Sequence, residues 1–296
     1  MLQQTRVAAV LDHYARFMLR FPTVQVLAAA REGSVLAAWS GLGYYHRARR
    51  MHEAAKVIVR ECGGVFPRSA EDWLDLPGIG RYTAAAVASI AFDEAVAVVD
   101  GNVERVLQRV CGDASGKEVA WTRAETLLDR ERPGDFNQAM MELGATICTP
   151  RAPQCLICPV HSLCSTRGVE ATRPQPARKN KETCYAMARR GDSVLLVQRA
   201  GDASLMAGMW ELPELAPGLV NGDAPLLRVR HSITDTDYRV SVFATAEGLF
   251  GGTRGEARWF TWKQCERLAL TGLARKILRK IANESTKADA VSKQMR

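Results

Sequence analysis

Hydrophobic residues in the first half of the chain recur every three or four positions, which is the spacing of one face of an α-helix. One such face is formed by Val7, Val10, Leu11, Tyr14, Phe17, Met18 and Phe21. The same spacing predicts further helices over 28–39, 48–59, 70–76, 82–91 and 103–110. Asp135 follows Pro133 and Gly134, and we expect it to N-cap a helix that runs through Ile147. Strand patterns are nearly absent, so residues 1–164 are expected to be all-helical.

The pattern changes after Cys164. Residues 165–183 hold two prolines, several basic residues and almost no large apolar ones, which is typical of a linker. Apolar runs between Gly and Asp turns then predict strands over 184–188, 194–198 and 238–243. A closing helix is expected over 263–281, and the polar tail from Asn283 is expected to be loose. We therefore expect four parts: a helical domain (1–164), a linker (165–183), an α+β domain (184–282) and a flexible tail (283–296).

Composition narrows the class of protein. The chain has 296 residues, of which 47% are hydrophobic and 24% charged, and this balance excludes wholesale disorder. No apolar run of about 18 residues suggests a transmembrane helix, and no secretory signal opens the chain. The net charge of +8 suggests an anionic partner. Eight cysteines without an export signal favour thiol or metal chemistry over disulfides.

Four of the cysteines are concentrated in one short segment. Cys148, Cys155, Cys158 and Cys164 fall within 17 residues, at the end of a predicted helix and in a proline-containing loop. Four thiolates suit a [4Fe–4S] cluster. A structural zinc is the alternative, although zinc sites more often show two close cysteine pairs and this segment has one. We favour the iron–sulfur cluster.

A second motif lies between two predicted helices. In the stretch from Leu76 to Ala84, Gly78 and Gly80 flank an isoleucine and allow a tight turn, and Arg81 follows. The next helix begins there and directs free N–H groups outward, which suits a phosphate. This is the signature of a helix–hairpin–helix element that binds the DNA backbone without reading sequence. An ordinary turn between helices is the alternative.

A third motif follows the hairpin. Asp100 ends an apolar run and stands before Gly101 and Asn102 at a predicted helix start. Alone, it would be interpreted as a helix N-cap.

Along the chain, the hairpin is followed by the Asp100 motif and then by the cysteine segment. In that order, the three motifs resemble the endonuclease III superfamily of DNA glycosylases, and more closely the adenine DNA glycosylases of the MutY type. The segments 1–7, 41–45 and 136–144 also match that family, so the resemblance covers essentially the whole chain. It implies an enzyme of base excision repair that removes adenine from A:8-oxoguanine or A:G mispairs in double-stranded DNA. It also implies a monomer with a [4Fe–4S] cluster, located in the cytoplasm or on a bacterial nucleoid.

The resemblance assigns roles to individual residues. Asp100 would stabilise the positive charge on the deoxyribose as adenine leaves, as carboxylates do in glycoside hydrolysis. Tyr82 and Asn102 would position the flipped nucleotide. The remaining residues expected to contact DNA are Gln3, Gln4, Tyr44, Gly78, Gly80 and Arg81. Lyases of the superfamily carry a Schiff-base lysine where this chain has Tyr82, so we expect a glycosylase without a lyase step.

The C-terminal domain resembles the Nudix-like domain with which these enzymes recognise 8-oxoguanine. Segments 194–199 and 208–213 match its first strands, but the chain lacks the acidic box needed for nucleotide hydrolysis. The recognition loop is expected over 230–236. There Ile233, Thr234 and Asp235 replace the Phe-Ser-His often found in the family. Thr234 keeps the hydroxyl group that could bind the lesion base, whereas Asp235 is poorly suited to lie near phosphates.

Adenine excision also needs a general acid that protonates N7. In the family this acid is a glutamate just before the motif that begins here at Met1. We expect a longer natural protein with some tens of residues upstream. One alternative is a lesion-binding protein without catalysis. Another is a related glycosylase for mismatched thymine or oxidised pyrimidines, which the Nudix-like domain disfavours.

We expect the 296-residue chain to bind an A:8-oxoguanine duplex without releasing adenine, because the acid is not among its residues. A single-turnover assay checks this expectation. Fast adenine release by this chain would contradict it.

Overall fold

The computed structural model describes residues 1–2, 5, 7–113, 116–167, 177–203, 205–215, 224–245 and 255–294. They belong to two compact units. One consists of Glu53–Gln175, and the other combines Met1–His52 with Pro176–Arg296. Among the described residues, no helix is both long enough and apolar enough to cross a membrane.

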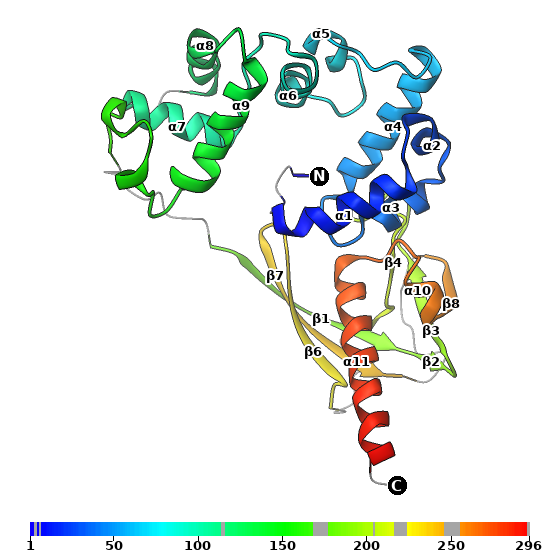
Figure 1. The fold of residues 1–296 in the computed structure, drawn as a ribbon. Helices are drawn as coiled ribbons and strands as arrows, with labels where there is room; N and C mark the ends of the chain where they lie inside the picture. The colour runs from blue at the N-terminus through cyan, green and yellow to red at the C-terminus, as the bar shows by residue number, and fades with distance from the viewer. Residues whose placement is uncertain are drawn as a thin grey trace. The chain divides into compact units, whose positions relative to one another are not determined.

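The described residues before Lys179 contain helices and no strand, as the pattern predicts (Figure 1). The α-helices are α1 (Val7–Arg20), α2 (Val24–Ala29), α3 (Glu32–Trp39), α4 (Tyr45–Glu61), α5 (Ala70–Leu74), α6 (Arg81–Phe92), α7 (Gly101–Cys111), α8 (Lys117–Leu127) and α9 (Pro133–Glu142). A π-helical turn, η1 (Leu143–Ile147), continues α9, and two short 3₁₀ turns follow, η2 (Cys155–Ile157) and η3 (His161–Leu163).

Three details of the helical prediction are wrong. The helix expected over 28–39 is two helices, because Ala30 and Arg31 are extended and separate α2 from α3. Asp135 is not an N-cap: Arg132 holds that position, and Asp135 lies in the first turn of α9 and pairs with Arg132. Helix α8 was not predicted at all.

Helix α1 buries only part of its apolar face. Val10, Phe17 and Phe21 are buried as expected. The other members of the predicted face remain exposed, with Val7 at 62% and Tyr14 at 56% of their accessible surface, together with Leu11 and Met18. The apolar residues of α1 therefore lie on two sides of the helix, and only one of these sides packs against the core.

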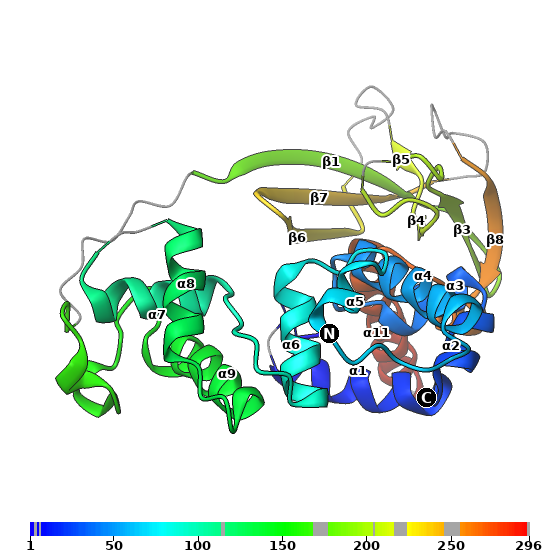
Figure 2. The ribbon, with the colours of Figure 1, turned by 90° about the horizontal axis from the view of Figure 1, so that it is seen from above.

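The described residues after Pro176 form two four-stranded sheets. The first has the order β5-β1-β7-β6, with β1 (Lys179–Met187) parallel to β7 (Thr236–Ala244), and β5 (Glu214–Leu215) and β6 (Leu227–Ile233) antiparallel to their neighbours (Figure 2). The second joins β2 (Arg189–Arg190), β3 (Ser193–Gln198), β4 (Trp210–Glu211) and β8 (Ala257–Thr261). Helix α11 (Gly272–Gln294) packs against β6, and its apolar residues complete one core with both sheets. The α+β prediction for this part is confirmed.

The boundaries here differ from the sequence prediction in several places. Strand β1 starts at Lys179, inside the predicted linker, whose residues 168–176 lie outside the described part. The expected closing helix is two helices, α10 (Trp262–Cys265) and α11. They are separated where Leu270 bridges to Trp210. Helix α11 continues past Asn283 to Gln294, through residues expected to form a loose tail.

Candidate functional site

The predicted hairpin connects α5 to α6. Gly78 has a φ of +75°, a left-handed conformation that favours glycine, and Ile79 N–H donates to the Leu76 carbonyl at 3.2 Å. Gly80 is the N-cap of α6 and offers no side chain to its first N–H groups. These donors are left for an external acceptor such as a phosphate oxygen.

Arg81 begins α6 at the same place. Its guanidinium pairs with Glu118 at 2.9 Å and lies over the Trp121 ring, 3.9 Å from the centroid. Both side chains of the ion pair are more than half exposed, so the pair contributes little to stability. A DNA phosphate could therefore replace Glu118 at small cost.

Asp100 is the N-cap of α7. Its Oδ1 accepts from the N–H groups of Asn102 and Val103, both at 2.8 Å, and its Oδ2 accepts from Asn102 Nδ2 at 2.9 Å. The positive end of the helix dipole also favours a carboxylate here. The N-cap interpretation and the catalytic interpretation are therefore compatible, because the cap bonds hold the carboxylate in one position.

Tyr82 lies near this carboxylate. Burial, followed by the negative charge of Asp100, raises the pKa of the Tyr82 phenol, and its hydroxyl donates to Met141 Sδ at 3.6 Å. Helices α6 and α7 thus bring Tyr82, Asp100 and Asn102 to one place.

The segment before Asp100 is positioned by a buried residue that the sequence analysis missed. Asn137 of α9 is 1% exposed. Its Oδ1 accepts from Val98 N–H at 3.0 Å, and its Nδ2 donates to the Val96 carbonyl and Ser89 Oγ, both at 2.9 Å. One amide therefore ties α9 to the extended run that leads to Asp100. Asn137 lies in the segment 136–144 that matches the family, but its role depends on hydrogen bonds to Val96 and Val98, which form only in the folded chain.

Arg105, one turn into α7, links the aspartate to the cysteine segment. Its Nη2 donates to Asn102 Oδ1 at 2.9 Å and to the Gly144 carbonyl at 2.6 Å, and its Nε donates to the Cys148 carbonyl at 2.8 Å. A hydrogen-bonded path thus runs from Asp100 through Asn102 and Arg105 to Cys148. This arginine was not predicted from the sequence.

Close packing fixes the same junction. A Cβ added to Gly144 would lie 2.6 Å from Asn102 Cβ and 2.9 Å from the Asn102 carbonyl oxygen. Real Cβ atoms do not approach so closely, so η1 can lie against the start of α7 only if residue 144 is glycine.

The four cysteines of the motif line a single pocket, with Arg109 and His161 also in its wall. Burial, and then the thiols of Cys148, Cys158 and Cys164, raises the pKa of Cys155. Among the described residues, no three His, Cys, Asp or Glu side chains are arranged to hold a single metal ion.

Arg109 is the charged group of this pocket, and it too was missed from the sequence. It is 4% exposed. Its guanidinium donates to Cys148 Sγ at 3.3 Å, to the Thr149 carbonyl at 2.8 Å and to the Pro150 carbonyl at 3.4 Å. Although burial opposes it, hydrogen bonds from Arg167 and Thr166, and then the positive charge of Arg109, lower the pKa of Cys164 in this pocket.

Other predicted residues lie elsewhere. Gln3 and Gln4 are outside the described residues. Tyr44 belongs to the other compact unit, where it has a φ of +47°, is 40% exposed and carries the Arg47 guanidinium 5.3 Å from its ring centroid. Thr234 is also in that unit, in the turn between β6 and β7, so the loop expected over 230–236 is mostly strand.

Replacement of the buried Arg109 by methionine should lower the free energy of unfolding by about 2–4 kcal/mol, because part-buried carbonyl groups lose a charged donor. Chemical denaturation measures this change. The matched control is Arg123→Met, which removes an arginine of the same unit whose partner Asp113 is exposed. It should cost less than about 1 kcal/mol. Equal effects of the two substitutions would contradict the structural role of Arg109.

Comparison with known proteins gives these residues a context. Residues 1–127 match the HhH-GPD superfamily of base excision DNA repair proteins. The adenine DNA glycosylase of Mus musculus is 38% identical over 358 residues, covering 94% of this chain and 69% of the mouse protein. That of Homo sapiens is 42% identical over 273 residues, covering 73% of this chain and 50% of the human protein.

Solved structures of DNA glycosylases are also similar to part of this chain. A thermostable thymine-DNA glycosylase is 32% identical, with a TM-score of 0.53 over 56% of this chain and 79% of that one. An endonuclease III trapped covalently on DNA is 25% identical, with a TM-score of 0.51 and the same coverage. The chain belongs to the adenine DNA glycosylase family within the HhH-GPD superfamily, and it is a DNA glycosylase of base excision repair.

Proposed function

We propose that this glycosylase removes adenine mispaired with 8-oxoguanine or guanine in double-stranded DNA, by hydrolysing the N-glycosidic bond without cutting the strand. The observation that supports this most strongly is the Asp100 carboxylate, held by three donors at the start of α7 beside Tyr82. The proposed monomeric state and cytoplasmic or nucleoid location rest on the family resemblance.

Loss of adenine leaves positive charge on the deoxyribose, as in other glycosidic cleavages. A carboxylate that is already fixed stabilises this charge without reorganising during the reaction. The bonds that hold Asp100 come from α7 itself, so its position does not depend on substrate. Asn102 stabilises the second carboxylate oxygen and is in turn held by Arg105.

The hairpin supports a glycosylase without a lyase step. A lyase needs an amine that forms a Schiff base with the sugar. Tyr82 occupies that position and has a raised pKa, so its phenol is protonated at neutral pH and serves as a positioning group. The target adenine must leave the base stack to reach Asp100.

We propose that DNA is held by the amides around Gly78 and Gly80 and by Arg81, once it releases Glu118. Gln4 and Tyr44 are proposed to enter the base stack near the lesion, and Gln3 is proposed to contact DNA. The exposed ring of Tyr44 supports this role for that residue. The division into a glycosylase domain (1–164) and a recognition domain (184–282) stays part of this proposal.

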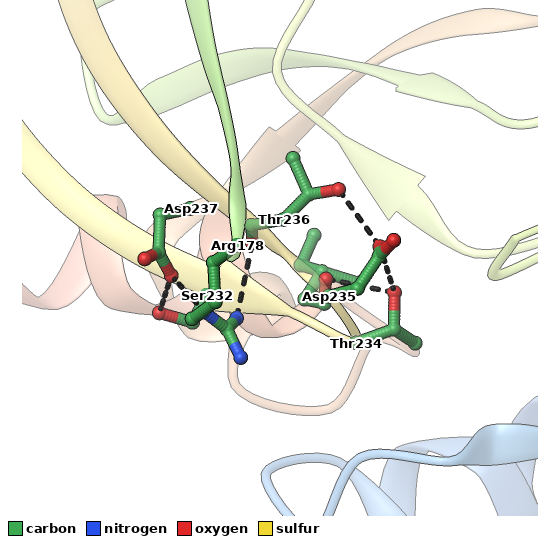
Figure 3. A network of polar contacts seen from close by, with 7 residues as sticks. Arg178, Ser232, Thr234, Asp235, Thr236 and Asp237 are labelled. Atoms are coloured by element: carbon green, nitrogen blue, oxygen red, sulfur yellow. Dashed lines mark hydrogen bonds and ion pairs between the residues drawn. The ribbon is translucent and has the colours of Figure 1, made fainter. Parts of the chain in front are cut away.

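The C-terminal domain is proposed to be Nudix-like and to recognise 8-oxoguanine through Thr234 (Figure 3). Thr234 has a φ of +50°, and its hydroxyl donates to the Ile233 carbonyl at 2.8 Å, which leaves its lone pairs as acceptors. Guanine N7 is an acceptor, whereas N7 of 8-oxoguanine carries a proton, so an acceptor here would distinguish the two bases.

Asp235, beside Thr234, gives the turn a fixed negative charge. The Thr236 hydroxyl, and then the Lys179 ammonium group, donate to its carboxylate and lower the pKa of Asp235. This chain therefore presents an acidic turn where the family often has histidine, and we propose that phosphates do not approach this side of the turn.

We propose that Cys148, Cys155, Cys158 and Cys164 hold a [4Fe–4S] cluster. The donor set fits, since four thiols surround one pocket that also contains the Arg109 guanidinium. When bound, the cluster would fix the loop that follows η1.

The role of Asp100 can be tested without adenine release. A duplex with a cationic pyrrolidine at the abasic position, opposite 8-oxoguanine, imitates the charged sugar. The wild-type chain should prefer it to a neutral tetrahydrofuran duplex by at least ~10-fold, and Asp100→Asn should lose the preference. Asparagine is an equally good N-cap, so the fold should be kept.

The control for this binding experiment is Asp113→Asn, an exposed aspartate of the same unit. It should leave the preference unchanged. Retention of the preference by Asp100→Asn would refute the proposed role.

The metal can be identified directly. Purified protein should be brown, absorb near ~400 nm and contain about four iron atoms per chain. Cys158→Ser should lose most of the iron, whereas Cys62→Ser, an exposed thiol in the same unit, should keep it. Metal analysis that finds one zinc and no iron would contradict the assignment.

A further inference from the structure

The hairpin formed by β6 and β7 carries a second feature besides its turn. Arg228 and Arg230 lie on β6 and Arg239 lies on β7, and all three side chains are exposed. We call these three residues the arginine face.

Strand register places the three guanidinium groups together. Arg230 pairs directly with Arg239 across the two strands, and Arg228, two positions along β6, pairs with Ser241. Residues two apart on a strand point to the same side and are about 6.7 Å apart. The arginine face therefore forms a compact patch on one side of the sheet.

The opposite side of the sheet is the core. Val229 pairs with Val240, and Leu227 with Val242, and this side packs against the apolar residues of α11. The arginines alternate with these buried residues, so they occupy the surface that the core does not use. The Lys276 ammonium group of α11 donates to the Arg230 carbonyl at 2.7 Å and adds positive charge at the edge of β6.

The positive charge is only partly balanced. Glu182 of β1 lies 3.8 Å from Arg239, at the limit of an ion pair. Asp237, nearer the turn, is occupied by Arg178 at 2.9 Å and by the Ser232 hydroxyl at 2.6 Å (Figure 3). Arg228 and Arg230 form no ion pair with any described residue.

Like charges directly opposite each other destabilise a sheet, so Arg230 and Arg239 reduce the stability of the fold. An anion between the guanidinium groups would offset this repulsion. Guanidinium groups match phosphate oxygens with two parallel hydrogen bonds. Since the chain belongs to a family of DNA repair proteins, the most accessible phosphates are those of its substrate.

We propose that the arginine face binds the phosphate backbone of the DNA duplex, independently of sequence and lesion. It begins next to the Ser232–Asp237 pair, close behind the turn that carries Thr234. The two parts of the hairpin then have different roles. The basic strands bind phosphates, and the acidic turn contacts a base.

Salt dependence of duplex binding tests this proposal. Each arginine that no longer neutralises a phosphate should lower the slope of log K against log salt concentration by about 0.9. Arg228→Gln/Arg230→Gln should therefore lower the slope by about 1.8, equally for an undamaged duplex and for an A:8-oxoguanine duplex. The control is Arg258→Gln, an exposed arginine of β8 whose guanidinium is already paired with Glu256 at 2.8 Å.

An unchanged slope in the double variant would overturn the proposal. A second result would also overturn it: the double variant binds DNA as well as the wild type does but loses the wild type's binding to a polyglutamate peptide. The arginine face would then bind an acidic protein segment. If the double variant unfolds, Arg239→Gln alone should lower the slope by about 0.9. The undamaged duplex separates this test from lesion recognition. If the protein shows no preference for the lesion, the proposed specificity is refuted, but the salt slope can still be measured on the undamaged duplex.

Discussion

The carboxylate of Asp100 is held by the helix that it caps. Two backbone N–H groups and one side-chain amide of α7 determine the position of both its oxygen atoms. Everything else at the site depends on where α7 begins. The buried amide of Asn137 fixes the extended run that leads to this point, and Gly144 allows η1 to lie against Asn102. A carboxylate positioned in this way needs no rearrangement when charge develops next to it.

The same helix connects the site to the cysteine loop. Arg105 and Arg109, one turn apart on α7, both donate to the backbone around Cys148, and Arg105 also holds Asn102. The cysteine loop and the Asp100 carboxylate are therefore connected by one continuous hydrogen-bond network. The proposed iron–sulfur cluster would therefore act on Asp100 through position, since anything that loosens the Cys148 backbone also loosens the support of Asp100.

The sequence predicted the parts of this site that have a pattern of their own. Cysteine spacing, the paired glycines of the hairpin and an aspartate before a helix are local signals, and the structure brings them together within one unit. Arg105, Arg109 and Asn137 were missed because their partners are remote: an arginine on a helix shows nothing of a carbonyl some 40 positions away until the chain is folded.

The boundaries of some elements were predicted wrongly because they too depend on remote contacts. Strand β6 contains four charged or polar residues among seven, and it is a strand because it pairs with β7 and packs on α11. The apolar stripe of α1 predicted its helix correctly but not which side would be covered, because periodicity does not distinguish two apolar sides.

The most direct test of the central claim is hydrogen exchange at the amides of Asn102 and Val103, which report the two bonds that hold Asp100 Oδ1. Removing the link to the cysteine loop by Arg105→Ala should speed their exchange by about 10-fold or more relative to amides of α6. Unchanged exchange at both amides would mean that Asp100 is positioned without the loop, and would contradict the account.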